Sequence, residues 1–332
     1  MKLKIDINII FIPLIIILIW ISSLNINAIN SSNLSNNFSI ISGNSGGTYY
    51  YIAAGQSKII NEEIGLNMLT QASSGSPVEN LALVANNSQN LAIVTIDGYY
   101  FGKNGEKDRG FNKKINNIEV LQIGHKAYLY ALTMEKNKIK SFKNIKGLNI
   151  GVPPIGSSTY YMALAILEAY GYKEKNINII PLSSQEQSEA LKDGEIDIAF
   201  IAGGLSQSTV MDLDFSSKIK FLSLEKEVQE KLNRDYPYWE SSVIPKNTYK
   251  NLKEDIYCLS VNTMLVCNKD IDEKISYNIT KVLNENTEKL GNIHISGFEW
   301  SKENTKKFLN NKILKFNLGA IKYYDEAFKS GL

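Results

Sequence analysis

The chain of 332 residues has a formal net charge of +2, from 36 Lys and Arg side chains against 34 Asp and Glu. This near balance gives no reason to expect a nucleic-acid partner. The length is sufficient for two domains or for one large one.

The N-terminus has the composition of a secretory signal peptide. Two lysines precede an apolar run over residues 9–24, and the small residue Ala28 follows as a plausible cleavage point. The run is short for a membrane span of about 20 residues and contains Pro13, so cleavage is favoured over an uncleaved anchor. We therefore expect residues 1–28 to be a signal peptide and the mature protein to be exported to the periplasm.

A glycine-rich stretch, residues 42–51, lies between a short apolar segment typical of a strand and an amphipathic helix. Such a junction leaves backbone N–H groups unpaired at the positive end of the helix dipole. Gly46 and Gly47 allow a ligand to approach the backbone, and Ser45 and Thr48 add hydroxyls. The stretch is a candidate site for an anionic or carbonyl-rich small molecule. The alternative is a turn that only caps the helix.

Strands and helices alternate through the rest of the first half. Strands are expected at residues 66–71 and 91–96, and the second is almost wholly apolar, as when both faces are covered. The helix between them begins after Ser76, a suitable N-cap followed by Pro77. Residues 91–96 lead into an expected turn at Asp97-Gly98. Two further extended segments are predicted, at residues 118–124 and 127–134.

The order of elements over residues 38–98 recurs over residues 147–204. Both halves have a strand, a Gly/Ser loop that ends in Thr-Tyr-Tyr, a helix, a second strand, a capped helix and an apolar third strand. Chance similarity between ordinary α/β segments is the alternative. We expect two β-α-β-α-β lobes.

The last third is less regular. A strand is expected at residues 218–224, and a polar helix or loop at 228–238 runs into the aromatic Tyr236–Trp239, which either closes over a cleft or packs on the surface. Residues 256–266 form an extended apolar run long enough to pass between lobes. Amphipathic helices are expected at residues 275–283 and 306–313.

A chain that returns to its first lobe makes two connecting strands and a hinge. We therefore expect a discontinuous first lobe of residues 29–128 and 258–332, and a second lobe of residues 129–257.

Open α/β sheets bind ligands at the carboxyl ends of their strands, so the loops of two facing lobes would converge on one cleft. No arginine lies near these loops, so backbone amides and helix N-termini would hold a ligand carboxylate, with Lys126 as a further candidate. The candidate ligand contacts are Ser45, Gly46, Gly47, Thr48, Tyr49, Ser76, Asn80, Thr95, Asp97, Gly156, Ser157, Ser158, Thr159, Gly203 and Gly204.

Catalytic or metal chemistry finds little support in the sequence. His125 and His294 lie in unrelated segments and are expected to be structural or on the surface. No P-loop lysine follows either Gly loop, and no Cys/His metal spacing occurs. We expect no enzyme activity, no metal and no cofactor.

The two cysteines, Cys258 and Cys267, are expected to remain unpaired. On one continuous strand they would be about 30 Å apart, whereas a disulfide needs Cα atoms within about 7 Å. A bond would require a turn near Asn262-Thr263.

The chain resembles the TAXI family, the extracytoplasmic solute receptors of one class of TRAP transporter, over nearly all of the part after the leader. The segments that carry this resemblance are Gly46–Tyr50, Gly75–Leu81, Leu91–Val94 with Asp97, Gly156–Thr159, Asp193–Asp197 and Asn284–Asn286.

The resemblance implies a two-lobe type II periplasmic-binding-protein fold (α/β), with a hinge and a ligand cleft between the lobes. It also implies capture of a small organic acid or amino acid such as glutamate, and delivery to membrane-embedded TRAP permease subunits, with the receptor as a monomer. Alternatives are a receptor for an ABC transporter, an enzyme on the same fold that lacks an acid–base pair, and an exported antigen or interaction protein that has lost ligand binding.

The chain departs from the family pattern within the expected cleft. Thr95 and Ile96 stand where Gln and Ser are common, Ile155 replaces a Pro, Ser158 replaces a Gly, and Gly204–Ser206 replaces a Gly-x-Pro turn. The fold expectation does not depend on these positions, but glutamate as the ligand does.

Overall fold

The structure is a computed structural model that describes residues 37–173 and 175–329. The expected signal peptide lies outside these residues. From Phe38 onward the described chain belongs to one compact unit.

Two β-α-β-α-β segments form the two lobes, as the repeat predicts. The first consists of β1 (Asn37–Ile41), α2 (Thr48–Ile64), β2 (Asn67–Gln71), α3 (Pro77–Ala85) and β3 (Asn90–Thr95). The second consists of β5 (Asn149–Val152), α5 (Ser158–Ala169), β6 (Asn178–Pro181), α6 (Ser184–Asp193) and β7 (Ile198–Gly203). The strand orders β2-β1-β3 and β6-β5-β7 correspond, and β1 with β3, β5 with β6 and β5 with β7 are parallel.

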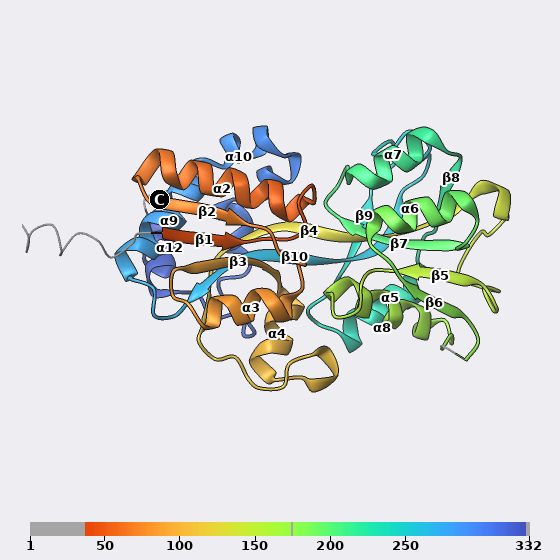
Figure 1. Cartoon of the computed structure of the whole chain (residues 1–332), viewed down its shortest axis with the longest axis horizontal. Coiled ribbons are helices and arrows are strands. Elements are labelled where there is room, and N and C mark those ends of the chain that lie inside the picture. The colour runs from red at the N-terminus through yellow and green to blue at the C-terminus, as the bar shows by residue number, and fades with distance from the viewer. Residues whose placement is uncertain (1–36, 174, 330–332) are drawn as a thin grey trace, which may run out of the picture. The chain divides into compact units, whose positions relative to one another are not determined.

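Helices cover both faces of each lobe's strands. In Figure 1, α2 lies on one side of the first lobe's strands and α3 on the other, while α6 and α5 flank the strands of the second lobe in the same way. The central strand β3 is therefore shielded from solvent after its first residue, and residues 91–95 are all buried.

Two long antiparallel strands, β4 (Ile118–Met134) and β10 (Ile256–Asn268), connect the lobes. β10 pairs with β3 through residues 263–267 and with β9 (Glu240–Ile244) through residues 256–260. β4 pairs with β7 through residues 128–132. Each long strand thus belongs to one lobe at one end and to the other lobe at its opposite end, which makes this pair the hinge.

The extended run predicted at residues 256–266 is confirmed, but the two segments predicted at 118–124 and 127–134 are one strand. The intervening residues stay extended because Lys126 and Tyr128 continue the ladder opposite Asn262 and Ser260 of β10. The predicted lobe limits at 128/129 and 257/258 fall within these long strands and stay a prediction.

The remaining elements complete the two lobes. They are α4 (Ile96–Asn104), η1 (Lys107–Arg109), η2 (Glu135–Asn137), α7 (Ser208–Ser216), β8 (Ile219–Phe221), α8 (Lys226–Asp235), α9 (Glu273–Glu285), α10 (Thr287–Ile293), η3 (Ile295–Glu299), α11 (Lys302–Lys306) and α12 (Leu318–Lys329).

Two local predictions are wrong. Asp97-Gly98 is the first turn of α4 rather than a loop, because Asp97 accepts a hydrogen bond from the Gly98 N–H (2.8 Å) and places a negative charge at a helix N-terminus. The helix predicted at residues 306–313 does not form, because α11 ends at Lys306. In the segment that follows, the Asn311 side chain accepts from the Ile313 N–H (2.8 Å) in a local turn.

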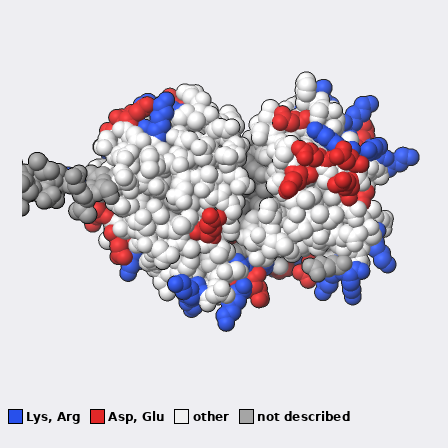
Figure 2. All heavy atoms as spheres, viewed as in Figure 1, with Lys and Arg blue, Asp and Glu red and all other residues white. Residues whose placement is uncertain are grey.

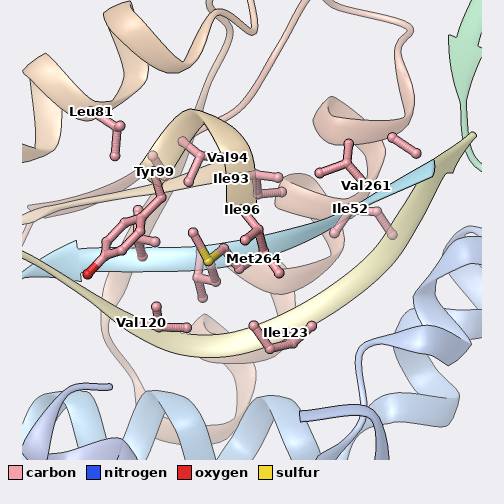
Figure 3. Close-up of a cluster of buried hydrophobic side chains, with 14 of the residues drawn as sticks. Ile52, Leu81, Ile93, Val94, Ile96, Tyr99, Val120, Ile123, Val261 and Met264 are labelled. Carbon is pink, nitrogen blue, oxygen red and sulfur yellow. The ribbon is translucent and has the colours of Figure 1, made fainter. Parts of the chain in front are cut away.

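The core of the first lobe packs helix, strand and long-strand side chains together. Figure 3 shows Ile52 of α2, Ile93 of β3 and Tyr99 of α4 around Ile123 and Met264, which come from the two long strands. All five are buried. This packing fixes the ends of β1 and β3, from which the site's loops extend.

Both cysteines are unpaired and buried on the single strand β10, as predicted. Burial raises the pKa of the Cys258 thiol to about 12. Within residues 37–173 and 175–329, no helix combines the length and the apolar character needed to cross a membrane.

Candidate functional site

A cavity of about 670 Å³ lies between the two lobes, where loops from the carboxyl ends of their strands converge. Figure 2 shows the groove between the lobes, with mainly uncharged side chains along its upper part. Most of the predicted contact residues line the cavity. They are Ser45, Gly46, Gly47, Thr48, Tyr49, Thr95, Ser157, Ser158, Thr159 and Gly203.

The other predicted contacts do not line the cavity. Asn80 is buried, and its amide donates to the carbonyls of Ser42 (2.8 Å) and Ile93 (3.0 Å), so it ties together the ends of β1 and β3. Ser76 caps α3 by accepting from the Val78 N–H, 3.3 Å away.

Gly204 lies behind the cavity wall, where a Cβ would be 2.3 Å from Ser296 Oγ. Gly156 is also not part of the cavity wall. Its carbonyl accepts from the Ser76 hydroxyl of the first lobe at 3.5 Å. Gly156 has φ +86 and therefore supplies a backbone conformation that other residues rarely adopt.

α2 begins at the cavity without a side-chain cap on its N-terminus. α4, whose N-cap Thr95 also lines the cavity, is uncapped as well, but Asp97 in its first turn accepts from the Gly98 N–H. The N-cap of α2 is Gly47, whereas α5, α6 and α7 are capped by the side chains of Ser157, Ser183 and Gln207. Gly46, with φ +90, sets the turn that leads into the helix. The first amides of α2 therefore face the cavity with a partial positive charge.

His125 of β4 lines the cavity although it is fully buried. Its Nδ1 accepts from Trp300 Nε1–H (3.1 Å), and the Thr263 hydroxyl donates to its backbone carbonyl (2.8 Å). Burial, with a contribution from nearby His294, lowers the pKa of His125 to about 3. The ring is therefore neutral, with its proton on Nε2, and this nitrogen has no partner within the described residues.

His294 also lines the cavity, from the start of η3. Its Nδ1 accepts from the Ser296 N–H (3.1 Å), and its ring stacks on Tyr51 of α2 at 6.1 Å. Burial lowers its pKa as well. The two histidines, expected to be structural or on the surface, come from segments far apart in the sequence, but β4 and the segment after α10 meet at the same wall of the cavity.

The cavity has one charged side chain in its wall, Asp212 of α7, and no lysine or arginine among its described lining residues. Lys126 does not line it, because its ammonium pairs with Glu240 at 2.6 Å. Anionic ligand groups would therefore meet amide, hydroxyl and imidazole N–H donors, and no formal positive charge.

Asp97 is buried beneath the cavity and connects the lobes. It accepts from Trp239 Nε1–H of the second lobe (2.8 Å), and beside it the hydroxyls of Thr95 and Ser158 lie 2.6 Å apart. Burial raises the pKa of Asp97, while these donors and the Gly98 N–H oppose the rise. Of the two possibilities for the aromatic loop, the structure shows Trp239 inside the junction between the lobes.

An aromatic cluster extends this junction below the cavity. The Tyr238 ring lies 5.2 Å from both Tyr100 and Phe101 of α4, and the Arg109 guanidinium lies 4.1 Å from the Tyr161 ring centre. These contacts join α4 and η1 of the first lobe to α5 and the α8–β9 loop of the second.

Residues 43–47 also read Gly-x-Ser-x-Gly, the pattern of a nucleophile elbow, in a strand–turn–helix context. An elbow holds its serine in a strained conformation, but here the positive φ belongs to Gly46 and Ser45 is exposed. Among the described residues, no hydrogen bond joins Ser45 to a histidine. No group of three or more metal-ligating side chains occurs in the described chain.

Sequence reasoning missed further lining residues of the second lobe. They are Ser183, Ser184, Gln185, Gln207, Ser208, Thr209 and Asp212. The repeat offered a signal for the first three, because the loop after β6 corresponds to the Gly/Ser turn after β2. No pattern in the sequence indicated that the start of α7 would lie in the cavity wall.

Solved structures with the same fold are periplasmic binding proteins. The periplasmic binding protein BugD aligns with a TM-score of 0.56 at 11% identity, over 89% of this chain and 97% of that one. MatC (Rpa3494) from Rhodopseudomonas palustris, with bound malate, aligns with a TM-score of 0.54 at 10% identity, over 87% and 98%.

The aliphatic sulphonate binding protein SsuA from Escherichia coli aligns with a TM-score of 0.50 at 15% identity, over 87% of this chain and 78% of that one. At such identities the likeness establishes the two-lobe type II fold alone. The model of the family described as NMT1-like matches residues 40–327, so the chain belongs to the NMT1-like family.

Proposed function

We propose that this protein is an extracytoplasmic solute receptor that captures a small organic acid or amino acid between its lobes. The observation that carries the proposal is the cavity of about 670 Å³, whose wall combines loops of both lobes and the N-termini of α2, α5, α6 and α7. A ligand that contacts both lobes stabilises the closed arrangement of the lobes, because these contacts exist together only when the lobes meet.

The cavity wall favours a ligand with a carboxylate. Amides at the start of α2 and the hydroxyls of Thr48 and Thr159 are donors suited to carboxylate oxygens. Asp212 in the same wall disfavours a second negative charge near α7. MatC, which has the same fold, is described with bound malate.

The proposal includes a membrane partner and a location. The resemblance to TAXI receptors supports delivery of the solute to TRAP permease subunits by an exported monomer, with the lobes divided at residues 128/129 and 257/258. On this reading the protein binds and releases its ligand unchanged, and has no catalytic role.

A thermal-shift screen of the purified protein against amino acids, hydroxy acids, keto acids and dicarboxylates tests the receptor function. A ligand at 100 times its Kd adds about 2.7 kcal/mol to the free energy of unfolding, which raises Tm by about 4 °C for a protein of this size. Native mass spectrometry of the same sample detects a ligand retained through purification.

The paired variants Thr159→Ala and Thr248→Ala locate the binding site. Thr159 lines the cavity, whereas Thr248 lies outside it and donates to the Pro245 carbonyl. We expect Thr159→Ala to weaken binding about tenfold and Thr248→Ala to bind as the wild type does. Absence of binding across the panel, with no retained ligand, would contradict the receptor function.

A further inference from the structure

We propose that His125 Nε2–H and the uncapped N-terminus of α2 form a subsite for a carboxylate of the ligand, held without any protein cation. The inference rests on the proposed receptor function and specifies its chemistry. It makes His125 a specificity-determining residue for small carboxylates.

The proton position on His125 follows from its partners. The Trp300 indole N–H can only donate, and it is directed at His125 Nδ1 over 3.1 Å, so Nδ1 must be the unprotonated nitrogen. The Thr263 hydroxyl also lies 3.2 Å from Nδ1, but its proton serves the His125 carbonyl at 2.8 Å. A neutral imidazole with an acceptor at Nδ1 carries its hydrogen on Nε2.

The Nε2–H group has no acceptor among the described residues although it is fully buried. A buried donor without a partner destabilises the fold, and such groups are rare in folded proteins. Because Trp300 and Thr263 occupy the Nδ1 side of the ring, Nε2 is the ring nitrogen that remains for a ligand, and His125 is among the residues that line the cavity. An acceptor on the ligand would satisfy this donor.

The N-terminus of α2 supplies a second set of donors at the same wall. Tyr49, in the first turn of α2, lies edge-on to the His125 ring with 5.9 Å between centroids. Gly47 provides no side-chain oxygen to the first amides, whereas α5, α6 and α7 have such caps. An uncapped helix start next to an unpartnered imidazole N–H is suited to the two oxygens of one carboxylate.

The wall around the subsite favours an acceptor with negative charge over a neutral carbonyl. A hydrogen bond to a charged acceptor contributes more to binding than one to a neutral acceptor. No lysine or arginine occurs among the described lining residues, so the anion would be held by the N–H and hydroxyl donors. Small acids should therefore bind more tightly than the corresponding amides, and His125 should account for part of the difference.

Isothermal titration calorimetry with matched pairs of probes tests the subsite. The pairs are L-lactate and lactamide, succinate and succinamide, and L-alanine and alaninamide. We expect the wild type to bind an acid more tightly than its amide. His125→Phe should weaken the binding of that acid about 10- to 100-fold and reduce the preference over the amide. His125→Gln should recover part of the affinity, because its amide N–H₂ reaches a position close to that of Nε2.

Tyr324→Phe is the matched control for the loss of a buried hydrogen bond at an aromatic residue. Tyr324 is buried in the first lobe, donates to the Leu121 carbonyl over 3.0 Å, and is not part of the cavity wall. We expect this variant to lose stability but to bind the acid as the wild type does. Circular dichroism and the Tm of each unliganded variant show whether it is folded.

A readout that needs no ligand comes from the ¹⁵N chemical shifts of the His125 ring nitrogens, which distinguish the two neutral tautomers. We expect the Nε2–H form at neutral pH and a shift of the Nε2 resonance when the acid binds. The Nδ1–H form, or unchanged affinity in His125→Phe, would overturn the subsite while leaving the receptor function intact. A wild type that prefers uncharged solutes would also overturn the carboxylate subsite but not the receptor function. No binding of any solute to the wild type would count against the receptor function itself.

Discussion

Asp97 shows how one residue can satisfy a pattern in the sequence and yet have a different role in the fold. It occupies a position of the expected cleft, but its carboxylate lies below the cavity and accepts from Trp239 Nε1–H and the Gly98 N–H. The side chain is fully buried, and burial is the largest influence on its raised pKa. We infer that Asp97 maintains the junction between the lobes, whereas contact with the ligand stays a prediction.

The raised pKa of Asp97 predicts a pH dependence of stability. A carboxyl whose pKa is higher in the folded state binds its proton more tightly when folded, so its contribution falls as pH rises from about 4, the value for an unfolded Asp, through the folded value. The ionisable groups near it, Tyr49 and Tyr238, remain neutral in this range because their pKa values are raised. We expect Asp97→Asn to lose less stability than the wild type between pH 4 and 8.

Urea unfolding of both proteins at a series of pH values measures this difference. Parallel curves of unfolding free energy against pH would contradict the assignment of the raised pKa to Asp97.

At the scale of elements, the two ends of α2 differ. Its N-terminus lacks a side-chain cap and faces the cavity, while its C-terminus is closed by Gly65, whose N–H donates to the Asn61 carbonyl over 3.2 Å. Gly46 and Gly65 both have positive φ, +90 and +66, and neither has an atom within 4 Å of an added Cβ. An alanine at either position would therefore cause backbone strain without a clash.

This symmetry gives a matched pair of variants. We expect Gly46→Ala and Gly65→Ala each to lower the free energy of unfolding by about 1 kcal/mol, because alanine disfavours positive φ. Only Gly46→Ala should weaken ligand binding, since it changes the turn that directs the first amides of α2. Urea unfolding and calorimetry on both variants provide the comparison; equal affinities would argue against a role of this helix end in binding.

At the scale of the whole molecule, the two lobes of the described chain meet through a few specific contacts in addition to the hinge strands. Trp239 and Asp97 form a hydrogen bond across the junction, and the hydroxyls of Thr95 and Ser158 form another. Separation of the lobes would expose the Asp97 carboxylate and the Trp239 ring. These contacts therefore favour the closed arrangement even before a ligand contributes.

Trp239→Phe removes one of these contacts and should shift the lobes toward an open arrangement. We expect the free energy of unfolding to fall by about 1–3 kcal/mol, because a buried carboxylate loses a donor. Ligand affinity should fall about tenfold, because closure then costs more. Small-angle X-ray scattering of the unliganded variant should give a larger radius of gyration than the wild type.

Tyr238→Phe, in the same loop, keeps the ring contacts with Tyr100 and Phe101 and is the control. An unchanged radius of gyration and affinity in Trp239→Phe would show that the hinge strands alone set the arrangement.

The sequence by itself determined the lobes and part of the cavity wall. Hydrophobic periodicity, helix-capping residues and glycine-rich turns are local sequence patterns, and here they occur twice in the same order. The elements β1 to β3 and β5 to β7 could therefore be predicted together with their Gly/Ser loops. The rule that ligands bind at the carboxyl ends of strands then brought together residues such as Thr48 and Thr159, both of which line the cavity.

Only the tertiary structure decided which polar residues face the cavity and which support it. His125 appeared isolated in the sequence, because its partners Thr263 and Trp300 are 138 and 175 residues away. Asn80 and Asp97 stand in loops that suggest ligand contact, but long-range bonds turn them into structural links. The physical reason is that burial and hydrogen-bond partners depend on the packing of distant segments, which local patterns do not encode.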